Sequence, residues 1–258
     1  MKIAIIGAGN VGKTLGTGLR AKGHTIIYGT RDPAKAEDRS AKTFAEAKTV
    51  SGALRGADAV ILATPWIATE SLVCEFAGEL AGKIVIDTTN PINPSLTRLA
   101  VGFDTSGAEL LQSQARKAKF YKAFNSTGVG VMAKPGFPEG KAVMFVAGPG
   151  GPDKKTVLRI VADVGFEAID AGELKAARLL EPLAMLWVQL ALNTQGRDFA
   201  FVMACRDAAN RNADPRVRMV HPHPQEAELS WIPSSSLRSH SKPRPMRPKR
   251  PRRSSCPG

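Results

Sequence analysis

The chain has 258 residues, of which 43% are hydrophobic, and a formal net charge of +13. It is long enough to bury a sizeable core, but no apolar run approaches the length of a membrane span, and the N-terminus has no charged leader. Because Cys74, Cys205 and Cys256 lie too far apart in the sequence for a disulfide framework or a zinc site, we expect a soluble, cytoplasmic protein without a metal.

Residues 1–205 alternate short apolar runs with segments of helical apolar spacing. We expect strands at 2–6, 25–29, 59–64, 83–87, 119–124, 142–147 and 166–170. We expect helices at 11–22, 66–80, 107–118 and 152–164, and, in the less regular segment 33–58, a helix from Pro33 and a very short strand near Val50. Strands that are apolar throughout are typical of a parallel sheet covered on both faces. The sequence therefore predicts an α/β fold with a doubly wound, mainly parallel, Rossmann-type sheet.

A glycine-rich turn follows the first expected strand. Gly7, Gly9 and Gly12 form G-x-G-x-x-G, with Asn10 and Val11 between them, directly before a helix. In a strand–turn–helix context the first glycine permits a tight turn, the second lets the backbone approach a pyrophosphate, and the third allows the helix to pack closely on the strand. The pattern predicts a dinucleotide site, with a merely tight turn as the alternative.

The end of the second expected strand indicates which dinucleotide binds. An NAD site places a carboxylate there to accept from the ribose hydroxyls. This chain instead has Thr30 and Arg31, with Lys35 shortly after, and these groups suit a phosphate. Asp32 is the competing candidate, but its place before Pro33 is typical of a helix N-cap. We therefore expect NADP.

One more helical segment, at about 173–192, ends the domain that we expect to span residues 1–205. Met185 and Trp187 within it are expected to make core contacts or contacts in a homodimer.

Residues 206–258 form a tail rich in proline, serine and arginine, with 12 Lys/Arg against 4 Asp/Glu. Few large apolar residues occur in it, so we expect disorder. The tail is either an unconstrained extension or a basic arm that meets nucleic acid non-specifically, and its abrupt start also allows a shifted reading frame.

Six segments together resemble one protein family. They are "GAGNVG", "YGTRDPAKA", "ILATPW", "DTTNP", "KAFNSTG" and "DAGELKAARLLEPLAMLWVQLA". The chain is similar over about residues 1–203 to the deazaflavin-dependent (coenzyme factor 420-dependent) NADP oxidoreductases. The resemblance implies hydride transfer between NADP(H) and a deazaflavin or a related flavin. The alternatives are an NADPH-dependent flavin or ferric reductase, and a non-enzymatic NADP(H)-binding protein that attaches to nucleic acid through its tail.

Three strand ends are expected to line the ligand cleft, because ligands in such folds bind outside the carboxyl ends of the strands. We expect cofactor contacts from Thr64, Pro65, Asn90 and Asn125, and a substrate pocket from Trp66, Thr89, Ser126 and Thr127. The resemblance supports the contact of Thr64 and Pro65; ordinary loop or packing roles are the alternatives for all eight. Asp87 is expected to hold its loop by hydrogen bonds. A ring stacked on nicotinamide needs little proton transfer, so we expect no catalytic side chain.

Overall fold

The computed structural model describes residues 1–33, 46–193, 196–204 and 217–218. The chain divides into two units, residues 1–221 and 222–258, and every described residue lies in the first unit. The expectations for Lys35, for the helix after Pro33 and for most of the tail therefore fall outside the described residues.

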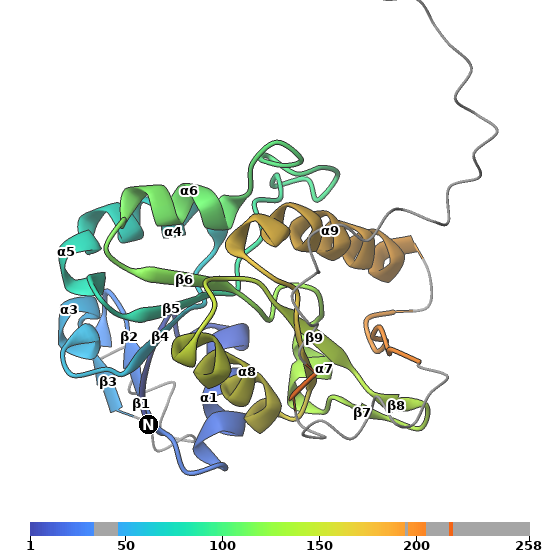
Figure 1. Ribbon diagram of the computed structural model, residues 1–258, viewed down its shortest axis with the longest axis horizontal. Helices are drawn as coiled ribbons and strands as arrows, with labels where there is room; N and C mark the ends of the chain where they lie inside the picture. The colour runs from blue at the N-terminus through green and yellow to red at the C-terminus, as the bar shows by residue number, and fades with distance from the viewer. Residues whose placement is uncertain (34–45, 194–195, 205–216, 219–258) are drawn as a thin grey trace, which may run out of the picture. The chain divides into compact units, whose positions relative to one another are not determined.

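A parallel sheet of six strands forms the centre of the first unit (Figure 1). In sheet order the strands are β3 (Glu46–Lys48), β2 (Thr25–Gly29), β1 (Lys2–Ile6), β4 (Ala59–Leu62), β5 (Ile84–Asp87) and β6 (Lys119–Lys122). The order reverses between β1 and β4, which is the arrangement of the Rossmann-type doubly wound fold. The predicted fold class is thus confirmed.

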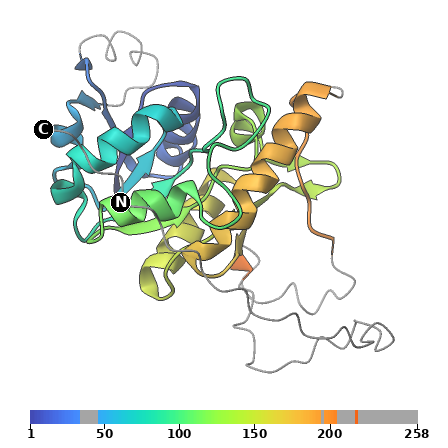
Figure 2. The same cartoon turned by 90° about the horizontal axis from the view of Figure 1, so that it is seen from above.

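Helices cover both faces of the sheet, as Figures 1 and 2 show. One face carries α1 (Asn10–Arg20), α7 (Val129–Ala133) and α8 (Pro152–Val164), and the other carries α3 (Val50–Leu54), α4 (Trp66–Glu75), α5 (Ala77–Leu80) and α6 (Gly107–Gln114). Neighbouring strand residues point to opposite faces: Ile3 and Ile5 pack with α1 and α8, whereas Ala4 and Ile6 pack with α3 and α4. Both sets are buried, which explains why the strands are apolar throughout.

The sheet continues beyond β6 through an antiparallel bridge. The Lys122 N–H donates to the Ala147 carbonyl at 2.8 Å, and the Ala147 N–H donates back at 3.1 Å. Next to this bridge, β9 (Val143–Val146) pairs in parallel with β10 (Glu167–Asp170), and β10 with β11 (Val217–Arg218). A short antiparallel pair, β7 (Gly136–Phe137) and β8 (Gly140–Lys141), precedes them. Val217 and Arg218 lie in the tail that we expected to be disordered, so at these two residues the structure departs from that expectation.

Several elements end earlier than their sequence pattern predicts. β4 and β6 end at Leu62 and Lys122, two residues before the expected ends. The segment 66–80 forms two helices because Phe76 leaves helical geometry, with φ −101° and ψ 17°. α6 ends at Gln114, and the Gln112 amide then donates to the carbonyls of Ala115 and Ala118.

The last helix, α9 (Ala177–Asn193), follows a single 3-10 turn, η1 (Leu174–Ala176), and agrees with the expected helix at 173–192. Trp187 is buried and stacks on Phe199 with a ring-centroid distance of 5.1 Å, and its indole N–H donates to the Phe199 carbonyl. Trp187 is thus a core residue, whereas Met185 is half-buried. Among the described residues, no helix is long and apolar enough to cross a membrane.

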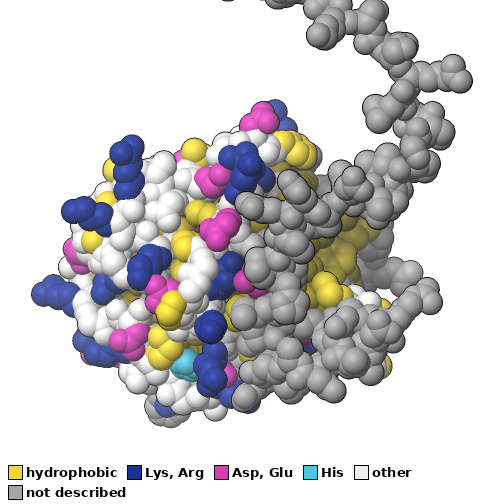
Figure 3. Space-filling view, viewed as in Figure 1, with side chains coloured by type: hydrophobic (Ala, Val, Ile, Leu, Met, Phe, Trp, Pro, Cys, Tyr) yellow, Lys and Arg dark blue, Asp and Glu magenta, His cyan; other side chains and the backbone are white. Residues whose placement is uncertain are grey.

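Charged side chains on the face shown in Figure 3 do not gather by sign. Lys and Arg are spread over the described surface with Asp and Glu between them. The strongest run of positive charge in the sequence lies after residue 218, outside the described part of the chain.

A lysine is fully buried at the end of β6. The Lys122 ammonium lies 2.6 Å from Asp87 Oδ2 and 2.8 Å from Glu181 Oε1, and it donates to the Thr89 carbonyl at 2.8 Å. None of the three charged side chains is exposed. The cluster therefore ties β5 and β6 to α9.

Both carboxylates of this cluster have further donors. Glu181 accepts from the Gly107 and Ala108 N–H groups at the start of α6, and Asp87 accepts from the N–H and hydroxyl of Thr89. The role expected of Asp87 in holding its loop is confirmed. Burial alone would lower the pKa of Lys122, but the charges and hydrogen bonds of Asp87 and Glu181 outweigh burial and raise this pKa. The stability that the ammonium contributes is therefore present below the ordinary lysine pKa, about 10.4, and is lost as pH rises through the raised value.

Removing this lysine should lower the free energy of unfolding. Lys122→Met leaves two buried carboxylates without their cation, and such a loss typically costs about 3–5 kcal/mol. We expect the free energy of unfolding in urea to fall by that amount. The control is Lys155→Met, at an exposed position of α8, which should change it by less than about 0.5 kcal/mol. Equal stability of Lys122→Met and the native protein would contradict the importance of the cluster.

Candidate functional site

The turn after β1 has no room for side chains at its first and third glycines. Gly7 has φ +109°, and a Cβ there would lie 2.6 Å from the Ala63 carbonyl oxygen. A Cβ at Gly12 would lie 2.0 Å from the Gly7 carbonyl oxygen. Both glycines are thus required by the protein's own packing, as the sequence pattern predicts.

Gly9 differs from Gly7 and Gly12, because no protein atom would prevent a side chain at this position. It has extended backbone geometry, and a Cβ there would meet no protein atom within 4 Å. α1 begins at the next residue, Asn10, with no acidic residue in its first turn and no side-chain cap. Asn10 is exposed, whereas Val11 packs against the core. The first N–H groups of the helix and its positive dipole end are therefore available to an anion.

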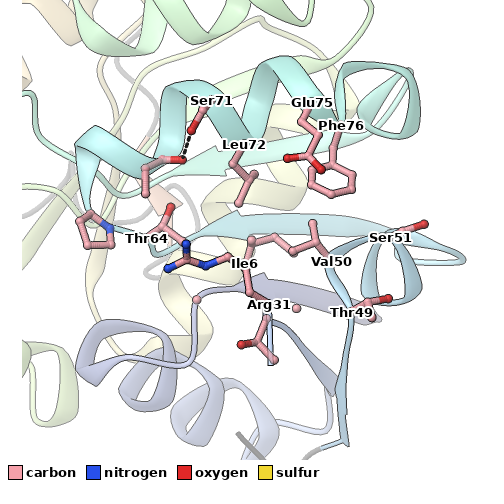
Figure 4. Close-up of a pocket in the computed structure, with 15 residues that line it drawn as sticks. Ile6, Arg31, Thr49, Val50, Ser51, Thr64, Ser71, Leu72, Glu75 and Phe76 are labelled. Atoms are coloured by element: carbon pink, nitrogen blue, oxygen red, sulfur yellow. Dashed lines mark hydrogen bonds between the residues drawn. The ribbon is translucent and has the colours of Figure 1, made fainter. Parts of the chain in front are cut away.

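A cavity of about 540 Å³ opens beside this turn, at the carboxyl ends of β1, β2 and β4 (Figure 4). Five predicted cofactor residues line it: Gly7, Thr30, Arg31, Thr64 and Pro65. The structure therefore brings together residues from three strand ends that are far apart in the sequence.

Other lining residues were not predicted as site residues. They are Ile6, Gly29, Thr49, Val50, Ser51, Ala68, Ser71, Leu72, Glu75 and Phe76. Those on α4, and Phe76 directly after it, resemble ordinary amphipathic-helix residues. The sequence signal that could have found them is the placement of Leu72, Glu75 and Phe76 three and four residues apart, hence on one side of the chain.

The end of β2 supplies a cation and a hydroxyl to the cavity. Arg31 is exposed and lines the cavity together with Thr30, and the Thr30 hydroxyl accepts a long hydrogen bond, 3.4 Å, from the Asp32 N–H. Asp32 does not line the cavity. Thr64, opposite, shares a 2.8 Å hydrogen bond with the hydroxyl of Thr69, so its side chain is held in place.

Asn90 and Asn125 are joined to each other and lie outside the cavity lining. The Asn90 amide donates to the Asn125 carbonyl at 2.8 Å, and the Asn125 amide donates to Asn90 Oδ1 at 3.1 Å and to the Leu180 carbonyl at 2.9 Å. Asn125 Oδ1 is buried and has no protein partner. The two side chains connect the loops after β5 and β6 and leave one acceptor unsatisfied.

The four predicted substrate-pocket residues have different surroundings. Thr89 and Ser126 are buried, and their hydroxyls contact Asp87 and the Met144 sulfur. Trp66 is half-buried, and its ring leaves no room for a side chain at Gly107. Thr127 is also half-buried, but its hydroxyl is enclosed and unpartnered. None of the four lines the 540 Å³ cavity.

A second cavity, of about 450 Å³, lies between α9 and the loop that precedes α6. Its lining is Arg98, Leu99, Gly102, Phe103, Pro182 and Met185. Phe103 is 77% exposed and has φ +64°, a conformation that is uncommon for an aromatic residue. Among the described residues no group of His, Cys, Asp and Glu side chains is arranged to hold a metal ion.

Fold and site together define a class of protein. A Rossmann-type sheet, a glycine turn with one open position and a cavity at the switch point of the strand order are the features of a dinucleotide-binding α/β protein.

Comparison with known proteins gives the family. The family model described as "NADP oxidoreductase coenzyme F420-dependent" matches residues 2–91. The F420-dependent NADP reductase of Methanocaldococcus jannaschii is 30% identical over 214 residues, which cover 76% of this chain and 95% of the relative. This chain belongs to the coenzyme F420-dependent NADP oxidoreductase family.

Two further comparisons extend this result. A solved structure from Arthrobacter sp. FB24, provisionally described as an F420-dependent NADP reductase, is 29% identical with a TM-score of 0.73, covering 80% of this chain and 100% of that one. The metalloreductase STEAP3 of Rattus norvegicus is 29% identical over 189 residues, 72% of this chain but only 37% of the relative.

The open position at Gly9 yields a test of the turn. Gly9→Val should leave the domain folded, because a side chain there meets no protein atom, yet it should abolish detectable NADPH binding. Gly18→Val on α1 is the matched control, since it too has open space but lies away from the turn, and its dissociation constant should be unchanged. Fluorescence titration gives the constants, and circular dichroism verifies the folding. Unaltered binding by Gly9→Val would contradict the assignment of the turn.

Proposed function

We propose that this chain is an NADPH-dependent oxidoreductase that transfers hydride between NADP(H) and a deazaflavin or flavin-like acceptor. The observation that carries the proposal is the pair Thr30 and Arg31 in the wall of the cavity, where an NAD site would have a carboxylate. The names of the relatives support the same reaction type.

The described residues fit an NADP molecule. The turn at Gly7, Gly9 and Gly12 would hold the pyrophosphate on the N–H groups of α1, because a side chain is absent where the phosphate must approach. Thr30 and Arg31 would bind the additional phosphate, with Lys35 as a further predicted contact. When bound, NADPH supplies the hydride and the protein supplies its position.

The interior charges of the domain are unsuited to acid–base work. Asp87, Lys122 and Glu181 are fully buried, and their charged groups are occupied by contacts within the protein. None of the three is therefore positioned to exchange a proton with a ligand. Their contribution is to fix the loops after β5 and β6, from which Asn90 and Asn125 reach the strand ends. Asn125 Oδ1 is enclosed and unpartnered, so the predicted contact of Asn125 with the nicotinamide amide requires a shift of the loop after β6. The buried charges are consistent with a reaction that needs orientation and little proton transfer.

The acceptor is assigned to the region between the loop before α6 and α9. The second cavity combines an exposed aromatic ring, Phe103, and a methionine, Met185, with the cation Arg98. Such a lining suits a planar ring with an anionic substituent. Trp66, Thr89, Ser126 and Thr127 line neither of the two cavities, so their part in the acceptor pocket stays a prediction.

A flavin or ferric reductase is the second candidate function, favoured by the match to the metalloreductase STEAP3. The cofactor site would be the same in both cases, so the two candidates differ only in what takes the hydride.

We also propose two features of the assembly. α9 directs Leu179 and Leu186, 72% and 51% exposed, to the surface, with Leu183 half-buried between them. The spacing of four and then three residues places these leucines on one face of α9. Such an apolar face suits a second copy of the chain, as expected of a homodimer through α9. The tail from residue 206 is proposed to be dispensable for catalysis, apart from the strand residues Val217 and Arg218, and to contact nucleic acid only non-specifically.

The identity of the acceptor is tested by anaerobic oxidation of NADPH against a deazaflavin, free flavins and ferric chelates, followed at 340 nm. We expect the deazaflavin to give the highest kcat/KM. Preferential turnover of free flavin or ferric chelate would replace the first candidate by the second. Tight NADPH binding without turnover of any acceptor would favour a non-enzymatic binding protein.

Cofactor preference is tested at Arg31. A hydrogen bond to a charged group contributes roughly 1.5–3 kcal/mol, so Arg31→Ala should weaken NADPH binding by about ten- to a hundredfold. NADH binding should hardly change, because NADH lacks the additional phosphate. Equal losses for both cofactors would mean that Arg31 supports the loop, and a native preference for NADH would overturn the NADP assignment.

A further inference from the structure

The 540 Å³ cavity has a slot with two apolar walls. Leu72 and Phe76 line it from the end of α4, and Val50 and Ile6 line it from α3 and β1. Figure 4 shows the Phe76 ring facing Val50 across the space. Apolar walls on two sides suit a flat heteroaromatic ring, which loses most of its water on entry.

Charges of opposite sign line the same cavity. Arg31 comes from the end of β2, and Glu75 comes from the last turn of α4, beside Phe76 in Figure 4. Within the described residues neither side chain has an ion-pair or hydrogen-bond partner, and they do not pair with each other. Arg31 is explained by the phosphate of the cofactor, but Glu75 is not.

Glu75 is exposed, so water hydrates its carboxylate, and a ring that displaces this water must offer a hydrogen-bond donor in its place. An ionised carboxylate only accepts hydrogen bonds, so Glu75 selects for a donor. The polar side chains nearby, Thr49, Ser51 and Ser71, are hydroxyls, which donate or accept and therefore cannot distinguish an amino group from a carbonyl.

We propose that Glu75 determines the base specificity of the cofactor: the adenine ring lies between Phe76 and Val50, and its exocyclic amino group donates to the Glu75 carboxylate. The inference rests on the proposed binding of NADPH and adds to it the chemical group by which the protein recognises adenine. A base with a carbonyl at that position would place two acceptors against each other and would bind more weakly.

The test compares NADPH with its hypoxanthine analogue, in which a carbonyl replaces the amino group. Dissociation constants are measured by fluorescence titration for the native protein and for Glu75→Ala, Glu75→Gln and Glu79→Ala. Glu79 is an exposed glutamate on α5 that does not line the cavity, so it is the matched control.

We expect the native protein and Glu79→Ala to bind NADPH about tenfold more tightly than the analogue, since a hydrogen bond to a charged group is at stake. Glu75→Ala should bind the two within about twofold of each other. Glu75→Gln should bind both well, because an amide offers an acceptor to adenine and a donor to hypoxanthine.

Two results would overturn the inference alone: equal affinity of the native protein for the two dinucleotides, or a tenfold preference that survives in Glu75→Ala. Failure of the native protein to bind either dinucleotide would instead overturn both this inference and the proposed function.

Discussion

The ammonium of Lys122, enclosed between Asp87 and Glu181, is the interaction on which the second half of the molecule depends. A charge can be buried only if its surroundings replace the water that it loses. Here β5 and α9 each contribute a carboxylate, the loop after β5 contributes a carbonyl, and the start of α6 meets Glu181 through two N–H groups. If any of these elements shifted, at least one charged group of the cluster would lose an ion-pair or hydrogen-bond partner. The cluster therefore fixes the positions of the loops that carry Asn90 and Asn125.

The first half is organised by a different constraint, the lack of space. Gly7 and Gly12 are enclosed by backbone, so the turn has a single shape, while the space beside Gly9 is left for a ligand. The cavity next to the turn is then bounded by a strand end on one side and by α4 on the other. In the proposed cofactor site, recognition of phosphate and recognition of a ring would thus be separated along one cavity, with cationic and apolar groups supplied by different elements.

Much of the fold could be predicted from the sequence because its signals are local. Strands that are buried on both faces have continuous apolar runs, as in 25–29. The glycine turn is recognisable within the six residues from Gly7 to Gly12. The candidate site was harder to predict from the sequence. Thr30, Arg31, Thr64 and Pro65 stand next to strand ends, so their place at the cavity could be predicted, but the walls formed by Leu72 and Phe76 depend on how α4 packs.

The partner of Lys122 is a similar case. A lysine within "FYKAF" and a glutamate within "LLEPLAML" are each conspicuous as single charges in apolar surroundings. Only the topology shows that they meet, because nothing in either segment specifies the other. β3 has three residues and α3 has five, too few for a periodic pattern to emerge, so 46–54 could be anticipated only as a short strand near Val50.

The contact between Glu181 and the start of α6 joins residues 74 positions apart, and this has a consequence during synthesis. The strands β1 to β4 can pair with one another before α9 has been made, because the residues that form these pairings all lie between Lys2 and Leu62. Lys122, Asp87 and the first turn of α6 must wait until α9 has been made. A growing chain that stops short of Glu181 would therefore hold a complete glycine turn beside a half in which Lys122 lacks its second carboxylate and the first N–H groups of α6 lack their acceptor.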